Sequence, residues 1–162
     1  MTAIKLLILS DSHGDYGSII DAAQREMPDE MIHLGDCWRD AERLGWACPD
    51  IPLYMVPGNC DDCWGKNDRL LLEKQGWKIL LAHGHQWRVK SGLSLALAAA
   101  RECGAHILLF GHTHQAICRR EDGLWVMNPG SVGGKFAPAT YGVLELTPEC
   151  VNMELRSVEK IQ

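Results

Sequence analysis

The sequence contains no run of about 20 apolar residues, no internal repeat and no low-complexity segment. A membrane-spanning helix is therefore not expected, and the apolar run that starts at Ala3 predicts a strand instead of a secretory signal. Basic residues are scarcer than acidic ones, 16 against 21, and the resulting net charge of −5 provides no general attraction for long nucleic acids. These absences favour a cytoplasmic protein with one globular domain over residues 1–162.

The sequence also lacks the even number of cysteines that is typical of a disulfide-bonded secreted protein. It has seven cysteines, and no secretory signal is expected, so free thiols in a reducing compartment are predicted. Cys60 and Cys63 form a CxxC motif, but no second CxxC is present to complete a zinc site. A redox or zinc-binding use of this pair stays open as an alternative.

Apolar runs alternate with helix-like segments in the first half of the chain and with turn residues in the second half. Strands are expected at residues 3–9, 30–34, 51–56, 69–75, 77–82, 106–110, 116–120, 124–127, 141–146 and 151–158. Helices are expected at residues 17–26, 38–45 and 93–103, with Gly104 ending the last of them. This order predicts an α/β fold in which two packed sheets are flanked by helices.

Metal-type ligands follow five of the apolar runs, in the segments ILSDSHGD, HLGDC, PGNCD, LAHGH and FGHTH. Together these segments supply Asp11, His13, Asp36, Asn59, His83, His112 and His114. Five of the seven histidines, His13, His83, His85, His112 and His114, lie just after expected strands, where the loops of an α/β sheet meet in space. The other two, His33 and His106, lie in or beside apolar runs and are expected to be structural.

Oxygen and imidazole ligands of this kind suit Mn, Fe, Ni, Co or Zn ions. Asp11 and His13 are two residues apart, so in an extended loop both would point the same way, and His112 and His114 repeat this spacing. Seven ligands are enough for two cations about 3.5–4 Å apart that share a carboxylate, and Asp36 is the expected bridge. Any one short motif has many false positives, but five in series indicate a two-metal site.

The motifs DSH, GD, GNCD, HGH and GHTH occur in this order and are followed by NPGS at residues 128–131. In this the sequence resembles the calcineurin-like metallophosphoesterase superfamily, in particular its small, single-domain, YfcE-like phosphodiesterases. The resemblance extends from residue 3 to about residue 158 and implies a four-layer α/β/β/α sandwich of two mixed β-sheets flanked by helices. It implies that Asp11, His13 and His114 hold the first metal, that Asn59, His83 and His112 hold the second, and that Asp36 bridges both.

The resemblance also implies an activity: hydrolysis of a small phosphodiester by a hydroxide that bridges two divalent cations. Manganese is expected first, with nickel, iron, zinc and cobalt as alternatives. Most of the superfamily has a His after the motif Asn, thought to protonate the leaving group, and Cys60 stands there in this chain. His85, two residues past His83, is the first candidate for this proton transfer or for phosphate contact. Cys60 is weaker, because a thiol with a pKa of about 8.5 is a poor acid for an alkoxide.

Substrate recognition is less defined by the sequence. Asn59 is expected to ligate a metal through its amide oxygen and to donate its NH₂ group to phosphate. Residues that follow the motifs and could contact phosphate or stack on an aryl group are Arg39, Arg88, Lys90, Trp38, Trp64 and Trp87. A homo-oligomer is an open alternative to a monomer.

Other functions are compatible with the same motifs. One is hydrolysis of phosphomonoesters, phosphoproteins or dinucleotides. The Cys at position 60, where most of the superfamily has a His, argues against the phosphoprotein substrate. Another is a non-catalytic protein-binding scaffold, a role that the retromer subunit of the same fold has. A nuclease is disfavoured, because the acidic balance of the chain provides no basic groove.

Overall fold

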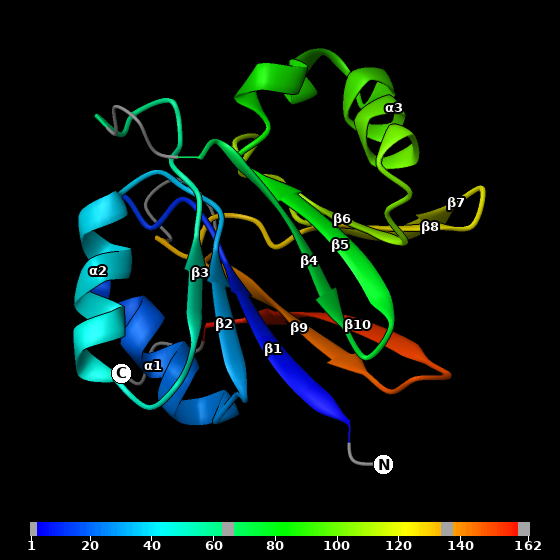
Figure 1. Ribbon diagram of the computed structural model, residues 1–162. Coiled ribbons are helices and arrows are strands. Elements are labelled where there is room, and N and C mark those ends of the chain that lie inside the picture. Colours follow the sequence, from blue (N-terminus) through cyan, green and yellow to red (C-terminus); the bar gives the residue numbers. More distant parts are fainter. Residues whose placement is uncertain (1–2, 63–66, 134–137, 159–162) are drawn as a thin grey trace.

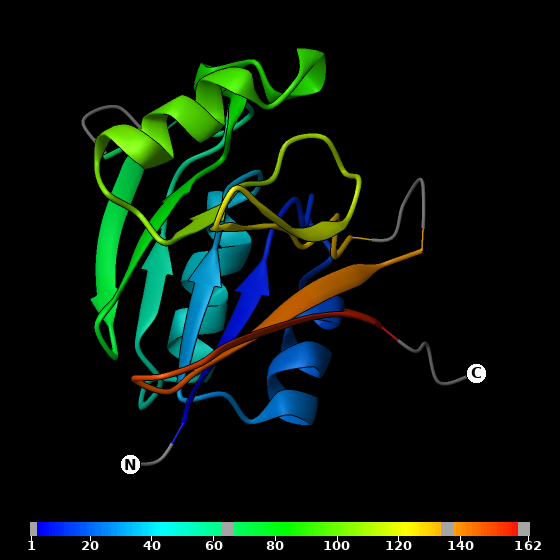
Figure 2. The same cartoon turned by 90° about the vertical axis from the view of Figure 1, so that its right-hand side faces the viewer.

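The computed structural model describes residues 3–62, 67–133 and 138–158. Two five-stranded sheets, ordered β10-β9-β1-β2-β3 and β4-β5-β6-β8-β7, pack against each other in these residues. Helices α1 and α2 cover the outer face of the first sheet and α3 covers the second (Figures 1 and 2). The expected four-layer sandwich of two mixed sheets flanked by helices is therefore confirmed.

The strands are β1 (Ile4–Leu9), β2 (Glu30–His33), β3 (Leu53–Met55), β4 (Arg69–Lys74), β5 (Trp77–Ala82), β6 (Ile107–Leu109), β7 (Ile117–Glu121), β8 (Leu124–Asn128), β9 (Thr140–Leu146) and β10 (Val151–Ser157). The helices are α1 (Tyr16–Glu26), α2 (Trp38–Ala47) and α3 (Ser94–Glu102), and two 3₁₀ turns, η1 (His85–Trp87) and η2 (Val89–Ser91), follow β5. None of the helices in the described ranges is long and apolar enough to cross a membrane.

Strand β1 shows how the sequence builds two core layers from one apolar run. Successive side chains of a strand point to opposite faces of the sheet. Leu6 and Ile8 pack in the layer between the two sheets, whereas Leu7 and Leu9 pack against the helices of the first sheet. All four side chains are buried, so this central strand is continuously apolar instead of alternating.

Helix α3 packs on the second sheet through its small residues. Ala96 and Ala100 are buried against strand residues such as Leu108 and Val126. The helix ends as predicted, because Gly104 adopts a left-handed φ of +71°. The Ala105 N–H group then donates to the Ala100 carbonyl, which is the bonding pattern of a Schellman motif.

The direction of the strands places the motif loops together. β1 runs parallel to β2, and β2 to β3, so all three end at one edge of the first sheet. β5 runs parallel to β6, and β6 to β8, so these end at one edge of the second sheet. The segments that carry the predicted ligands follow these strands directly, and the layered packing brings the two edges into contact.

Candidate metal centre

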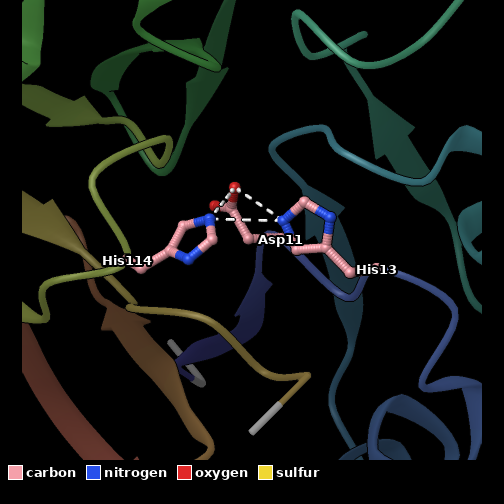
Figure 3. A group of neighbouring side chains, drawn as sticks. All are labelled: Asp11, His13 and His114. Carbon is pink, nitrogen blue, oxygen red and sulfur yellow. Dashed lines mark hydrogen bonds and ion pairs between the residues drawn. The ribbon is translucent and has the colours of Figure 1, made fainter. Parts of the chain in front are cut away.

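The first group of candidate ligands lies where β1 and β6 end. Asp11 and His13 follow β1, and His114 follows β6 (Figure 3). The His114 Nε2 atom lies 3.2 Å from Asp11 Oδ1 and 3.2 Å from His13 Nε2. One potential ligand atom from each residue lies within 4.8 Å of the others, a spacing that a single cation can bridge.

The second group lies beside it, where β2, β5 and β6 end. It contains Asp36, His83 and His112, whose potential ligand atoms also lie within 4.8 Å of one another. The His83 Nε2 atom is 3.4 Å from Asp36 Oδ2 and 3.1 Å from His112 Nδ1. The side chain of His83 is fully buried, and its Nδ1 atom lies 2.9 Å from the Leu34 carbonyl oxygen, which fixes the ring.

The two groups are contiguous. The Asp36 Oδ2 atom, which belongs to the second group, lies 3.8 Å from His13 Nε2 of the first. The Asp11 Oδ1 atom, which belongs to the first, lies 3.9 Å from His83 Nε2 of the second. The Asp36 carboxylate therefore lies between the groups, the position that a bridging ligand requires.

Left-handed backbone conformations aim these side chains. The φ angles of Asp11, His13, Asp36, His112 and His114 lie between +46° and +71°. Asp11 and His13 do offer ligand atoms to one group, as expected, but the expected extended loop is wrong, because both residues have left-handed φ angles. Non-glycine residues rarely adopt this conformation, and such residues cluster at functional sites.

Two glycines leave room for the carboxylates. A Cβ atom on Gly58 would lie 2.0 Å from Asp36 Oδ1 and 2.5 Å from the Asp36 backbone nitrogen. A Cβ atom on Gly111 would lie 2.7 Å from Asp11 Oδ2. The glycines of the GNCD and GHTH segments are therefore explained by close approach to the acidic ligands, without any requirement for a positive φ.

The electrostatics keep both acids ionised. Burial alone would raise the pKa of Asp11, but the neighbouring His13 and the charge of His83 outweigh it, so that the pKa is lowered. Burial would likewise raise the pKa of Asp36, and His83 again reverses the shift. Burial, with help from His83 and Lys90, lowers the pKa of His112 to about 4, so its imidazole is neutral at pH 7. Ionised carboxylates and the neutral His112 imidazole are ready to bind cations. Burial would lower the pKa of His83, but Asp36 and Asp11 raise it, so a cation would have to displace a proton from that ring.

The donor set fits divalent cations. Asp11 Oδ1 is buried and has no hydrogen-bond partner among the described residues, and such an atom is costly unless a cation or donor meets it. Imidazole nitrogens face each other at 3.1–3.2 Å in two pairs. Together the carboxylate oxygens and imidazole nitrogens form a mixed ligand set. Such a set suits Mn, Fe, Ni, Co or Zn ions, and it differs from the thiolate ligands of a structural zinc site.

The other predicted site residues lie at the margin of the two groups. Asn59 is exposed, and its Nδ2 atom lies 3.7 Å from Cys60 Sγ. The Cys60 N–H donates to Asp36 Oδ1 at 3.0 Å, which places this loop beside the candidate bridge. Burial and the charge of Asp36 raise the pKa of the Cys60 thiol, so it is an even weaker acid than expected.

His85 faces the second group. Its ring centroid lies 5.6 Å from that of His83 and 6.2 Å from that of His112. Its Nδ1 atom is buried without a hydrogen-bond partner in the part of the chain that the structure describes. Burial and the charge of His83 lower the pKa of His85, which disfavours the protonated form that a general acid needs.

The residues considered for substrate contact are dispersed. Trp87 is 5% exposed and packs in the core of the second sheet, so it offers no surface for stacking. Lys90 is exposed, and its charge contributes to the lowered pKa of His112. Trp64 and Cys63, the latter part of the CxxC motif, lie outside the described residues.

Asp61 positions the centre and was missed by sequence reasoning. Its Oδ2 atom accepts hydrogen bonds from the backbone N–H groups of Asp36 at 3.0 Å and Gly58 at 2.8 Å. Its Oδ1 atom accepts from the N–H groups of Cys37 at 3.2 Å and Trp38 at 2.9 Å. One carboxylate therefore ties the loop after β2 to the loop after β3. The sequence feature that could have indicated this role is the position of Asp61 at the end of the GNCD motif, directly after Asn59 and Cys60.

The NPGS segment holds the ligand loops from the other side. Asn128 is buried, and its Nδ2 group donates to the Gly111 carbonyl at 3.1 Å and to Thr113 Oγ1 at 2.9 Å. The Ser131 hydroxyl donates to the Asp11 carbonyl at 2.7 Å. These bonds fix the loop that carries His112 and His114 and the loop that carries Asp11.

His33 is structural, as expected. It is 1% exposed, and burial lowers its pKa to about 4, so its ring is neutral. Its Nδ1 atom accepts from the Gly35 N–H at 3.2 Å, which leaves Nε2 to carry the proton and to donate to Ser12 Oγ at 3.0 Å. The ring therefore links the loop after β1 to the loop after β2.

A sandwich of two mixed sheets with aspartate and histidine ligands at one edge defines a class, the metallophosphoesterases. The model of the calcineurin-like phosphoesterase superfamily domain matches residues 4–149, so the chain belongs to this superfamily. It is 37% identical over 132 residues to "Probable metallophosphoesterase YsnB" of Bacillus subtilis, covering 80% of this chain and 75% of that protein. It is 27% identical over 172 residues to "Phosphodiesterase YfcE" of Escherichia coli, covering 88% of each.

Solved structures show the same fold. A protein of Streptococcus pneumoniae described as a predicted phosphoesterase superposes with a TM-score of 0.77 at 25% identity, covering 96% of this chain and 99% of that one. Wild-type Vps29 of Entamoeba histolytica complexed with Zn²⁺ superposes with a TM-score of 0.76, covering 96% of this chain and 100% of that one. At 19% identity the second likeness concerns the fold alone.

Proposed function

We propose that the protein is a phosphodiesterase that uses two divalent cations to hydrolyse small phosphodiesters. The observation that carries the proposal is the pair of adjoining ligand groups, with Asp36 Oδ2 3.4 Å from His83 Nε2 and 3.8 Å from His13 Nε2. Membership of the superfamily supports phosphoester hydrolysis. The relative named as a phosphodiesterase supports the diester as substrate.

Each group would hold one cation, with Asp36 as the shared ligand and Asn59 completing the second group. Two bound cations would supply Lewis acidity toward the phosphoryl oxygens and acidify water near neutral pH. The Asp11 and Asp36 carboxylates together offset only half of the +4 charge of such a pair. The centre would therefore attract a phosphate anion although the whole protein carries a charge of −5.

Asn59 and His85 are the chain's own candidates for contact with the substrate. Asn59 is exposed, so its NH₂ group can donate to a phosphoryl oxygen. His85 faces the second group, and its lowered pKa favours a neutral ring that donates one hydrogen bond to phosphate over a ring that protonates the leaving group. Manganese is the first cation to test. We also propose a cytoplasmic location and a homo-oligomeric state, and both stay predictions.

The test of the activity is hydrolysis of bis(p-nitrophenyl) phosphate by chelator-treated protein, with Mn, Ni, Zn, Co, Fe or Mg added back in turn. Asp36→Asn is expected to abolish turnover, whereas the matched control Asp62→Asn removes an exposed carboxylate and should retain it. p-Nitrophenyl phosphate in parallel distinguishes diester from monoester preference. Folded protein without turnover on any metal would refute the proposal.

The role of His85 has its own test. A general acid matters most when the leaving group is a poor one, because a nitrophenolate leaves without protonation. Phosphate contact predicts that His85→Ala lowers turnover of nitrophenyl and alkyl diesters by similar factors. A loss confined to alkyl diesters would instead assign the proton transfer to His85.

The scaffold alternative has less support. Asp11, His13, Asp36, His83, His112 and His114 all keep side chains able to bind a cation and converge within two groups. A scaffold reading predicts a folded protein that binds cations without turnover, which the same assay would reveal.

A further inference from the structure

A hollow of about 540 Å³ lies between two walls of the second sheet's outer side. The first wall is the segment from η2 into α3, and its residues include Lys90 and Ser94. The second is the loop from β6 into β7, and its residues include Thr113, Gln115 and Arg119. The segment between β5 and α3 lies above this loop in both views of the molecule (Figures 1 and 2).

The second wall is part of a ligand loop. Thr113 lines the hollow and lies between His112 and His114 in the chain. These two histidines belong to different groups of candidate ligands, so the wall is one residue, about 3.8 Å between Cα atoms, from each group. The Asn128 amide donates to Thr113 Oγ1 at 2.9 Å and holds the wall in place. The hollow therefore begins directly beside the candidate metal centre.

The floor of the hollow is apolar and rests on the loop of the second ligand group. Val89 and Phe110 line the hollow and are 4% and 1% exposed. Both pack against Gly84, where a Cβ atom would lie 3.0 Å from a Val89 methyl carbon and 3.4 Å from Phe110 Cβ. Gly84 directly follows His83, so the same packing supports the floor and this candidate ligand.

The hollow carries one positive charge that no acid offsets. Its charged lining residues are Lys90, Arg119 and Glu121. Arg119 pairs with Glu121 at 2.9 Å, whereas no carboxylate oxygen among the described residues lies within 4.0 Å of the Lys90 ammonium group. Burial is the main cause of the lowered pKa of His112, and the charges of His83 and Lys90 add to it. The ammonium group therefore lies within electrostatic reach of the second ligand group.

Uncharged polar groups complete the lining. Ser91, Ser94 and Gln115 are exposed, and their side chains make no hydrogen bond within the part of the chain that the structure describes. An occupant would meet an ammonium group, hydroxyls and an amide above an apolar floor. This combination suits a polar alcohol that carries an anionic group, and it suits a plain alkyl or aryl group poorly.

We propose that the hollow is the subsite for the alcohol portion of the phosphodiester and that Lys90 selects esters whose alcohol carries a second anionic group. A charge-assisted hydrogen bond from the ammonium group to a carboxylate or phosphate oxygen would supply this preference. The serine hydroxyls and the Gln115 amide would meet hydroxyl groups of the alcohol. The inference rests on the proposed phosphodiesterase activity and names its substrate class.

Three p-nitrophenyl diesters isolate the second anionic group. They release the same nitrophenolate and keep a propyl, a 2-carboxyethyl or a 2-phosphonooxyethyl group on phosphorus. The readout is the ratio of kcat/KM for each anionic ester to that for the propyl ester, in Mn²⁺-loaded protein. The wild type should favour at least one anionic ester, and the larger ratio distinguishes a carboxylate from a phosphate. A ratio of one or less for both anionic esters would overturn the proposal.

Variants of Lys90 test the residue. Lys90→Gln should lower the ratio about tenfold, as expected for loss of one charge-assisted hydrogen bond at a site open to water, and Lys90→Arg should retain most of it. The control Lys78→Gln removes an equal, exposed charge near the start of β5, at the end away from the ligand loop, and should leave the ratio unchanged. An equal loss for all three esters in Lys90→Gln would mean that Lys90 meets the phosphate being cleaved, which also overturns the subsite.

A second readout does not need turnover. Propylphosphonate, 2-carboxyethylphosphonate and ethane-1,2-diphosphonate correspond to the three esters and contain no ester bond to cleave. Calorimetry in the presence of Mn²⁺ should show that Lys90→Gln raises the Kd of the preferred anionic phosphonate about tenfold and leaves that of propylphosphonate unchanged. If no diester is cleaved, the proposed activity fails and this comparison alone decides. Equal Kd values of both proteins for both anionic phosphonates overturn the subsite in either case.

Discussion

Asp61→Asn changes one oxygen of the carboxylate that joins the Asp36 loop to the Gly58 loop into an NH₂ group. Oδ1 and Oδ2 each accept two backbone N–H groups in the native protein. Whichever oxygen the NH₂ group replaces, two backbone N–H groups lose their acceptor and face the hydrogens of the new NH₂ group instead. The substitution leaves the size of the side chain almost unchanged, so the effect isolates these hydrogen bonds.

The expected loss of stability follows from the number of bonds. A hydrogen bond to a charged group contributes about 1.5–3 kcal/mol. Asp61 is half-buried, so the lower end of this range applies, and two bonds lost correspond to about 3 kcal/mol. The same loops carry Asp36 and Asn59, and loss of residues that orient metal ligands typically weakens cation binding by about 10–100-fold.

Urea unfolding of chelator-treated protein measures the first quantity, and calorimetric titration with Mn²⁺ measures the second. Asp62→Asn is the matched control, because it makes the same chemical change at the neighbouring, exposed carboxylate. The control should differ from the wild type by less than about 0.5 kcal/mol. If the two variants are equally stable and bind Mn²⁺ equally, Asp61 does not hold the loops and the reasoning is refuted.

Three other substitutions test separate contacts. Gly111→Ala would place a Cβ atom 2.1 Å from Ser10 Oγ and should weaken Mn²⁺ binding at least tenfold by calorimetry, whereas Gly17→Ala, which meets nothing closer than 3.9 Å, should not. Asn128→Ala should cost about 2–3 kcal/mol in urea unfolding, because it leaves the Gly130 N–H without its buried acceptor; a loss below 0.5 kcal/mol would contradict this. Glu26→Gln tests a pH dependence. Burial alone would raise the pKa of Glu26, but hydrogen bonds from Tyr141, Arg156 and Lys5 lower it from 4.5 to about 2. A lowered pKa stabilises the fold above pH 4.5, and this contribution is lost as the pH falls toward 2. The stability difference between wild type and Glu26→Gln should therefore be larger at pH 7 than at pH 3, and equal differences would rule the mechanism out.

The sequence predicted the strands and the ligand segments well, because both depend on local patterns. Leu6 to Leu9 form an unbroken apolar run, and such runs mark central strands of a parallel arrangement. Asp11, Asp36, His83 and His112 each follow a run of this kind, so the topology brings the first two to one edge of the first sheet and the last two to one edge of the second. Helix α3 ended at Gly104 for an equally local reason.

The parts that were not predicted depend on contacts between distant segments. Asp61 acts on N–H groups 23 to 25 residues away, and no local pattern records such a partner. The left-handed φ angles of Asp11 and His13 arise where the chain turns out of β1 toward α1, which alternation along a strand does not describe. The short η1 and η2 turns have too few residues to show a helical period.

The position of His112 and His114 has a consequence for how the centre forms. Each ligand group takes one of these two residues, and His114 lies 101 residues after its partner His13. Neither group can be completed until the chain has folded through β6 and docked the second sheet on the first. A complete ligand group would therefore be available to a cation only after the two halves have joined, and bound cations would stabilise the joined state against their separation.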